Sequence, residues 1–263
     1  MLINVKKRLN RDTLLLIKKL VNWRNKPSSV LFVAGMQRSG TNMLMDALES
    51  SLVTDVYHEW DERAFTNYQM KDRAVIHRLF EQSRGQVFTI KALCEVQDLT
   101  ELMSAFKPAK VIWIFRKYED VVNSMMRSFA NMDQQIIRLA DDPNSEAWLG
   151  KGMSEATHAI LKRIIRPGIS LASASALQWY IRNVLFFEQH FETNEKVLPV
   201  IYEDLVGNPV TELRKVFEFS GIQYSGRISA NIHGASVGKQ QPMPVDEQIA
   251  ELCASLQERI IGL

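Results

Sequence analysis

The fold is set by one stretch of sequence, Val30-Leu-Phe-Val-Ala-Gly35-Met-Gln-Arg38-Ser-Gly40-Thr-Asn42-Met-Leu44. Its first five residues are apolar without alternation, which is typical of a strand buried on both faces of a parallel sheet. A tight polar loop follows, and apolar residues then recur at helical spacing over residues 41–52. The stretch therefore predicts a strand, a loop and a helix, which together form the first unit of an α/β fold.

The same unit recurs along the chain. Short apolar runs predict further strands at residues 86–91, 111–115 and 196–202. Each run is followed by a stretch with helical periodicity, at residues 96–106, 118–129 and 208–219. Because strands that alternate with helices form a parallel sheet covered on both faces, we predict an α/β fold. Its architecture is three-layer α/β/α with a central, P-loop-like parallel sheet.

The loop after the first strand has the spacing of a phosphate-binding loop. Four residues separate Gly35 from Gly40, and small residues let backbone N–H groups converge on phosphate oxygens at a helix N-terminus. A nucleoside triphosphate loop would continue Gly-Lys-Ser/Thr, whereas this loop continues Gly40-Thr41-Asn42 and carries its cation earlier, at Arg38. We therefore predict an anion-binding loop. A glycine turn that only connects strand and helix is the alternative.

The balance of charge excludes some classes of partner. Among 263 residues, 32 are Lys or Arg and 30 are Asp or Glu, which gives a net charge of +2. A chain so close to neutral does not bind nucleic acid through bulk charge, so any anion must be held by a local group of donors. No group of His, Cys and Asp has metal-ligand spacing, and we predict no metal site.

The first loop resembles that of a known family. Residues 37–44 are similar to the 5′-phosphosulfate loop of sulfotransferases that use 3′-phosphoadenosine 5′-phosphosulfate (PAPS). The resemblance implies sulfuryl transfer to an acceptor hydroxyl by in-line displacement without a metal, with adenosine 3′,5′-bisphosphate (PAP) as the product. It also implies donor contacts from several loop residues, namely Arg38, Ser39, Gly40, Thr41 and Asn42.

A second signature of this family is an Arg at the end of a strand with a Ser eight residues later. Arg116 and Ser124 match this signature, which implies that they bind the 3′-phosphate of the donor. The match agrees with the chemistry, because ligands of open α/β sheets bind at the carboxyl ends of strands and a guanidinium suits a phosphate dianion. Tyr202, at a later strand, is expected to face the donor nucleotide.

Two further matches complete the donor site that the resemblance implies. Residues 234–239 resemble the C-terminal loop that closes over the 3′-phosphate, which implies contacts from Ser236, Gly238 and Lys239. Lys91, at a strand end, matches a lysine that many members place beside the sulfuryl group. Because the leaving phosphate needs cations as the S–O bond breaks, we assign Arg38 and Lys91 to that role.

The acceptor hydroxyl also needs a general base. Several members of the family place a catalytic Glu at a similar distance past the loop, which points to Glu59, 21 residues after Arg38. His58 is the second candidate, because histidine titrates near neutral pH. Asp61 is the third, and a solvated acidic loop without a catalytic role is a further alternative.

One domain is predicted over residues 1–263. The donor-binding core is expected at residues 30–130, and a closing strand, helix and donor loop at residues 196–241. Residues 131–190 are predicted to form a helical insertion over the active-site side and to line the acceptor. Extra scaffold helices are the alternative for this segment.

The acceptor is expected to be a carbohydrate, a lipid or a small metabolite, and a peptide tyrosine is a further alternative. Basic residues of the insertion hint at an anionic acceptor, with a solvated basic face as the alternative; they are Lys151, Lys162, Arg163 and Arg166. Two other functions stay open. One is a P-loop kinase that uses ATP and Mg²⁺, which the missing Gly-Lys-Ser/Thr disfavours, and the other is a non-catalytic nucleotide-binding protein.

The N-terminal residues 1–27 predict a basic amphipathic helix whose apolar stretch is too short for a signal or a membrane span. Such a helix either contacts an anionic membrane peripherally or packs on the domain with a solvated basic face. Cys94 and Cys253 are too few for a disulfide framework, and the chain has no Asn-x-Ser/Thr sequon. We therefore expect a cytoplasmic protein, with a single disulfide as the alternative.

Overall fold

A computed structural model describes residues 13, 17, 18, 20, 26–226, 228, 229, 232 and 244–263. The predicted N-terminal helix lies mostly outside the described residues, and so do the predicted donor contacts of Ser236, Gly238 and Lys239. In the described part of the chain, no helix has the length and the apolar character needed to cross a membrane.

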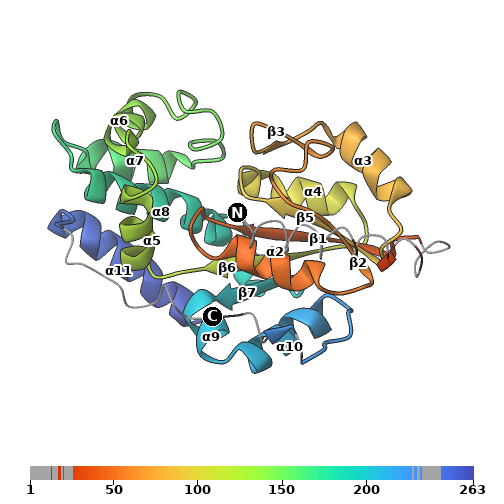
Figure 1. The fold of residues 1–263 in the computed structure, drawn as a ribbon. Coiled ribbons are helices and arrows are strands. Elements are labelled where there is room, and N and C mark those ends of the chain that lie inside the picture. Colours follow the sequence, from red (N-terminus) through yellow and green to blue (C-terminus); the bar gives the residue numbers. More distant parts are fainter. Residues whose placement is uncertain are drawn as a thin grey trace.

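The centre of the fold is a sheet of five strands in the order β2-β5-β1-β6-β7. They are β1 (Ser29–Gly35), β2 (Thr54–Tyr57), β5 (Val87–Ala92), β6 (Ala109–Phe115) and β7 (Val197–Ile201). Every neighbouring pair is parallel. Helices lie on both sides of this sheet, so the predicted α/β architecture is confirmed (Figure 1).

The apolar run of β1 fills two separate cores. On one face, Leu31 and Val33 share a core with helices α2 (Thr41–Glu49), α9 (Tyr202–Gly207) and α10 (Pro209–Phe219). On the other face, Val30 and Phe32 belong to a larger core. This core includes buried residues of α4 (Leu99–Ala105), α5 (Tyr118–Met126) and α8 (Leu171–Glu188). Because neighbouring side chains of a strand point to opposite faces, a strand covered on both sides must be apolar throughout.

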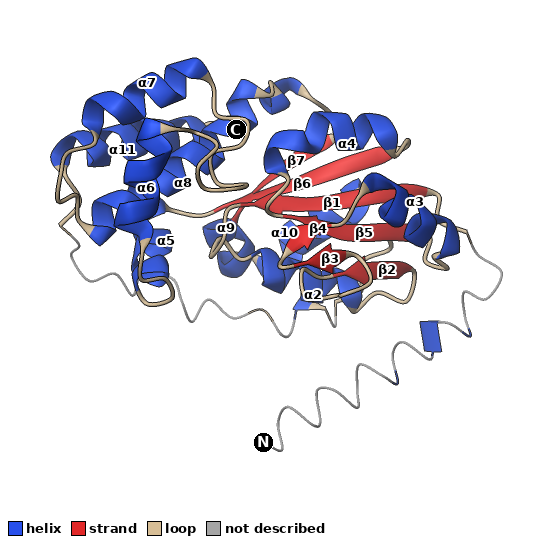
Figure 2. Cartoon of the chain, turned by 90° about the horizontal axis from the view of Figure 1, so that it is seen from above, coloured by secondary structure: helices blue, strands red, loops and turns tan. Residues whose placement is uncertain are grey.

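A group of helices lies beyond the carboxyl end of β6 (Figures 1 and 2). It consists of α5, α6 (Met132–Asp141), α7 (Glu155–Ile164), α8 and α11 (Glu247–Ile261). Helix α8 is buried along almost its whole length and contacts α5, α6 and α11. Residues 131–190 are thus largely helical, and their longest helix packs in the core. Residues of the loop between α6 and α7 line a cavity that is described below.

Some elements are not predicted by the sequence pattern. They are β2, the hairpin of β3 (Phe65–Thr66) and β4 (Gln69–Met70), helix α3 (Arg73–Gln82) and helix α11. Short 3₁₀ turns also occur at Val96–Asp98 and Phe191–Thr193. One boundary needs correction: the last strand ends at Ile201, so Tyr202 begins α9 instead of ending the strand.

Candidate active site

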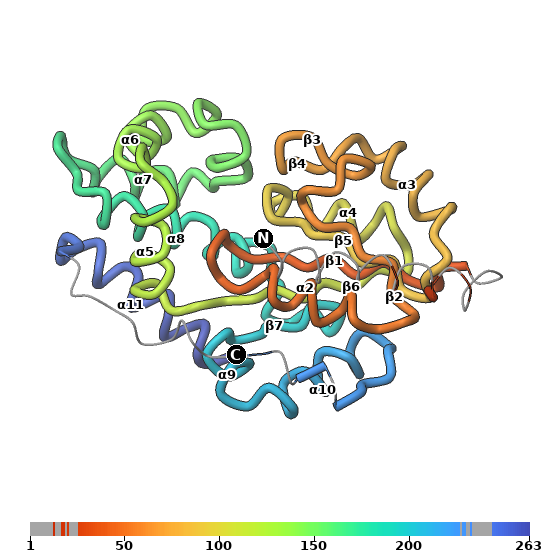
Figure 3. The backbone as a smooth tube through the Cα atoms, viewed as in Figure 1, coloured from red at the N-terminus to blue at the C-terminus, as the bar shows by residue number. Residues whose placement is uncertain are grey.

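The loop from β1 to α2 turns sharply because two of its residues adopt the left-handed conformation (Figure 3). Arg38 has φ 67° and Gly40 has φ 96°. A Cβ added to Gly40 would lie 2.6 Å from Cε2 of Tyr202, so both the backbone and this ring require glycine here. Gly40 is the N-cap of α2 and has no side chain, which leaves the first N–H groups of the helix to an anion.

The structure brings the two predicted phosphate signatures together. Arg38 Nε donates a hydrogen bond to Ser124 Oγ on α5, with 2.8 Å between the atoms. Arg116, directly after β6, donates from Nη1 to the backbone carbonyl of Arg38 at 3.1 Å. These residues meet because β6 lies beside β1 in the sheet and both strands end at the same edge. The loop and the second signature therefore form one site.

Arg116 is held on several sides. Its guanidinium carbon lies 4.5 Å from the centre of the Tyr202 ring, and its Nη2 lies 3.7 Å from Oδ2 of Asp120. Its backbone carbonyl accepts a hydrogen bond from Nε1 of Trp179 at 2.9 Å. Trp179 is fully buried, so this ring packs in the core, whereas the Tyr202 ring lies between Arg116 and the loop.

Lys91 connects the loop to one of the predicted bases. Its Nζ lies 2.6 Å from Oε2 of Glu59 and donates to Oδ1 of Asn42 at 2.7 Å. The Lys91 side chain is 2% exposed. Burial lowers the pKa of Lys91, and the neighbouring carboxylate of Glu59 opposes that shift. An ammonium shielded from water in this way acts strongly on nearby anions.

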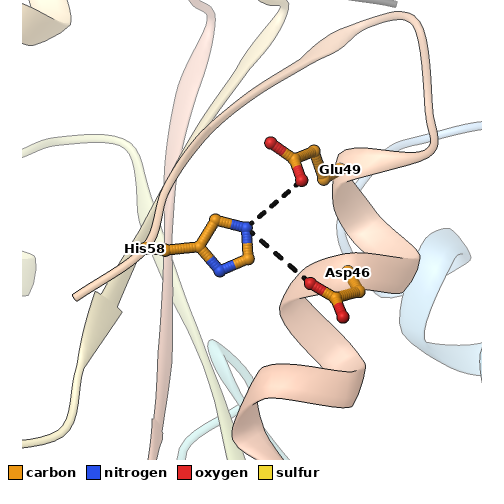
Figure 4. A group of neighbouring side chains, drawn as sticks. All are labelled: Asp46, Glu49 and His58. Carbon is orange, nitrogen blue, oxygen red and sulfur yellow. Dashed lines mark hydrogen bonds and ion pairs between the residues drawn. The ribbon is translucent and has the colours of Figure 1, made fainter. Parts of the chain in front are cut away.

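The three candidate bases point in different directions. Glu59 follows β2, which pairs with the strand that carries Lys91, and its side chain is 19% exposed. His58 is completely buried and is turned toward α2 (Figure 4). Asp61 forms an ion pair with Arg63 at 2.6 Å. Of the three, Glu59 is the candidate that contacts Lys91 among the described residues.

His58 forms a small group with two carboxylates of α2 (Figure 4). Its Nε2 lies 3.4 Å from Oε2 of Glu49 and 4.0 Å from Oδ1 of Asp46. Ligand atoms of the three residues lie within 4.8 Å of one another, a spacing that a cation could bridge. A metal-bound histidine normally donates from its other ring nitrogen, but Nδ1 of His58 has no hydrogen-bond partner among the described residues. The group is therefore better explained as an anchor for the segment that precedes Glu59.

A cavity of about 540 Å³ lies between the β3–β4 hairpin, the segment after β5 and the loop between α6 and α7. Arg182 of α8 joins two of these walls. It donates to the carbonyl of Trp148 at 3.0 Å and to Oε1 of Gln97 at 2.9 Å. Burial lowers the pKa of Arg182 to about 10. The sequence pattern misses Arg182 and Glu95, which lines the cavity, because a buried charge inside an apolar segment does not reveal its partners.

The loop and the strand order define a P-loop-like fold, with Arg38, Lys91 and Arg116 gathered at the carboxyl edge of its sheet. The family described as Sulfotransferase domain matches residues 28–250. The chain therefore belongs to the sulfotransferase family. The matched residues include both phosphate signatures, Glu59 and Lys91. Among proteins with curated functions, none matches this chain.

Several solved sulfotransferase structures share the fold. The sulfotransferase domain of the Synechococcus PCC 7002 olefin synthase has a TM-score of 0.51 and 12% identity. The superposition covers 89% of this chain and 96% of that domain. The sulfotransferase domain of the curacin biosynthetic pathway has a TM-score of 0.50 and 13% identity, with coverage of 89% and 98%. A sulfotransferase from Alicyclobacillus acidocaldarius has a TM-score of 0.50 and 14% identity, with coverage of 90% and 93%.

Proposed function

We propose that the protein transfers the sulfuryl group of PAPS to a hydroxyl of an acceptor and releases PAP. The observation that carries this proposal is the 2.8 Å hydrogen bond from Arg38 to Ser124, since it joins the two phosphate signatures at one edge of the sheet. PAPS carries anionic groups at its 5′ and 3′ positions, and a site with two phosphate-binding elements suits such a molecule. Membership of the sulfotransferase family supports the same reaction.

The donor is proposed to lie along the carboxyl edge of the sheet. The 5′-phosphosulfate is bound by the side chain of Arg38 and by the N–H groups of Ser39, Gly40, Thr41 and Asn42. The 3′-phosphate is bound by Arg116 and Ser124, with Ser236, Gly238 and Lys239 as the remaining proposed contacts. Tyr202 packs on both Gly40 and Arg116, and it is proposed to contact the nucleotide that these residues bind. In this proposal the side chains supply the positive charge, and no metal takes part.

Glu59 is the proposed general base. It accepts the proton of the acceptor hydroxyl while the acceptor oxygen forms a bond to sulfur and the bond from sulfur to the 5′-phosphate oxygen breaks. Lys91 and Arg38 stabilise the negative charge that collects on the leaving phosphate. Lys91 contacts both Glu59 and Asn42, so its side chain bridges the proposed base and the donor loop.

The proposal is tested by following two labels in parallel. The full-length chain is incubated with [³⁵S]PAPS, or with [γ-³²P]ATP and Mg²⁺, and a panel of hydroxylated acceptors. We expect transfer of ³⁵S in the presence of EDTA and no transfer of ³²P. Transfer of ³²P alone would overturn the proposal in favour of a P-loop kinase. Tight PAP binding without any transfer would favour a nucleotide-binding protein that is not an enzyme.

We also propose a reducing compartment, the cytoplasm, as the place of action. Cys94 and Cys253 are both free and buried, and disulfides are rare in that compartment. Burial raises the pKa of the Cys94 thiol to about 12, so this thiol is unreactive at neutral pH.

A further inference from the structure

The acceptor is the part of the proposed reaction that the phosphate signatures leave open, and the following inference rests on the proposed sulfuryl transfer. The cavity of about 540 Å³, called the acceptor cavity below, is lined in part by Cys94, three residues after Lys91. Lys91 belongs to β5, which ends at Ala92, so Cys94 lies two residues beyond the strand that carries Lys91. Cys94 therefore borders the acceptor cavity and closely follows the strand that carries the proposed catalytic lysine.

The cations of the acceptor cavity are already engaged. Lys151 pairs with Asp98 at 2.8 Å, and Arg73 pairs with Glu101. Lys71 donates from Nζ to a backbone carbonyl. Four carboxylates line the cavity against these three cations. The lining therefore has no surplus of positive charge for an anionic acceptor, and Lys151 is balanced by Asp98.

Glu95 lines the same cavity and has spare hydrogen-bonding capacity. Its Oε1 accepts a hydrogen bond from the backbone N–H of Met70 at 2.7 Å. Its buried Oε2 has no hydrogen-bond partner among the described residues. Because the last torsion of a glutamate is soft, a small rotation turns this oxygen toward a ligand. A group that donates a hydrogen bond there removes the penalty of a buried, unpaired acceptor.

The protonation of Glu95 favours a hydroxyl over an ammonium as that group. Burial raises the pKa of Glu95 to about 7, so both forms of the carboxyl occur near neutral pH. A hydroxyl both donates and accepts, and it therefore pairs with either form. An ammonium only donates and suits the carboxylate alone.

The wall of the acceptor cavity also includes an aromatic ring. Trp148 lines the cavity and is half-buried, and the guanidinium carbon of Arg182 lies 5.0 Å from the centre of its ring. Ile76 and Phe106 also border the cavity but are 0% and 2% exposed, so the apolar surface open to a ligand comes from Trp148. An aromatic ring beside polar groups suits a sugar ring, which has hydroxyls at its edge and C–H groups on its faces. The volume lies within the usual range of about 300–1,000 Å³ for small-molecule sites.

We infer that the acceptor cavity binds a neutral, polyhydroxylated acceptor of the size of a mono- or disaccharide, with one hydroxyl on Glu95 and the reacting hydroxyl directed toward Glu59. Among the acceptor classes that the sequence leaves open, the charge balance disfavours an anion and the polar lining disfavours a lipid chain. A neutral carbohydrate satisfies both conditions.

The test measures binding of chosen probes to the full chain saturated with PAP. Saturation-transfer NMR compares maltose and lactose with glucuronate as the anionic probe, glucosamine as the cationic probe and decanol as the apolar probe. We expect a neutral disaccharide to bind at least about tenfold more tightly than the other three probes. Preference for glucuronate, glucosamine or decanol would overturn the inference, and so would binding of none of the probes.

Two variants locate the binding in the acceptor cavity. Glu95→Leu removes the hydrogen-bonding oxygen and Gln69→Trp fills the cavity from the exposed hairpin; we expect each to weaken disaccharide binding about tenfold or more. Glu95→Gln, which keeps a donor and an acceptor, and Glu218→Leu, on α10 across the sheet, are expected to bind like the parent chain. Unchanged disaccharide binding in Gln69→Trp would overturn the inference even if Glu95→Leu fails to fold. PAP binding is measured in every variant as a check on the donor site. If the parent chain itself does not bind PAP, the proposed function is contradicted instead of the inference about the acceptor.

Discussion

Lys91 Nζ lies 2.6 Å from Oε2 of Glu59, although the two residues belong to segments that are separate in sequence. They meet because β2 and β5 are neighbours, so Glu59, two residues past the end of β2, lies beside the end of β5. The pair is almost closed to water on the lysine side and partly open on the glutamate side. This asymmetry suits a cation that serves the donor and a carboxylate that meets an incoming acceptor.

Replacement of the proposed base is expected to slow turnover without weakening donor binding. Glu59→Gln keeps the shape of the side chain but cannot accept the proton, so we expect kcat to fall about 100-fold or more. Calorimetry with PAP is expected to give a dissociation constant within about twofold of the parent value. Asp61→Asn is the matched control and should keep most of the activity. Equal loss in both variants would contradict the assignment of Glu59.

Arg116 is expected to determine donor affinity. Arg116→Lys keeps the charge but loses the planar fork that binds phosphate through two hydrogen bonds. We expect the KM for PAPS to rise about tenfold, equivalent to about 1.4 kcal/mol. Arg127→Lys, at the exposed C-cap of α5, is the control and should leave the KM unchanged. If adenosine 5′-phosphosulfate, which lacks the 3′-phosphate, lost affinity to the same extent as PAPS, the proposed contact would be wrong.

Gly40 is expected to tolerate no side chain. Gly40→Ala combines an unfavourable backbone conformation with a clash against the Tyr202 ring. Gly221→Ala is a matched control, because Gly221 has φ 71° but an added Cβ would meet nothing within 4 Å. We expect Gly221→Ala to lower the free energy of unfolding in urea by about 1 kcal/mol and Gly40→Ala by clearly more. Equal losses would show that the ring contact does not constrain the loop.

The stability of the protein is expected to depend on Glu95 through pH. Burial raises the pKa of Glu95 from its ordinary value of 4.5 to about 7, so the folded chain binds more protons than the unfolded chain between these values. The contribution of Glu95 to the free energy of unfolding therefore falls as the pH rises through this window. Glu95→Gln has no titrating carboxyl at this position and does not lose this contribution. The free energy of unfolding of the variant minus that of the parent chain should therefore increase by about 2 kcal/mol between about pH 5 and pH 8. Urea unfolding at several pH values measures the difference, and a constant difference would contradict the burial of this carboxyl.

The central part of the fold is predictable from the sequence because β1 must be apolar on both faces and its loop must contain glycines. The same reasoning does not find β2, which has four residues at the edge of the sheet, or the two-residue strands of the β3–β4 hairpin. Helix α3 is not predicted either, because Ile76 is its one buried residue and a single buried position gives no helical period. Short elements carry too few alternating positions for a period to emerge.

The parts of the site that lie at the ends of predicted strands are predictable from the sequence. Arg38, Arg116 and Lys91 stand at strand ends, where a parallel sheet gathers ligand contacts. The contact between Lys91 and Glu59 depends on the order of strands, which periodicity does not determine. The partners of Arg182 come from segments as many as 89 residues away, so no local pattern contains them.

The cluster of Arg38, Ser124 and Arg116 is proposed to bind PAPS and its product, and calorimetric titration with PAP in EDTA measures this binding. We expect one PAP to bind per chain without a metal. We also expect Arg116→Lys to weaken this binding and adenosine 5′-monophosphate to bind at least about tenfold more weakly than PAP. Binding of ATP with Mg²⁺ and none of PAP would show that this cluster is not a PAPS site.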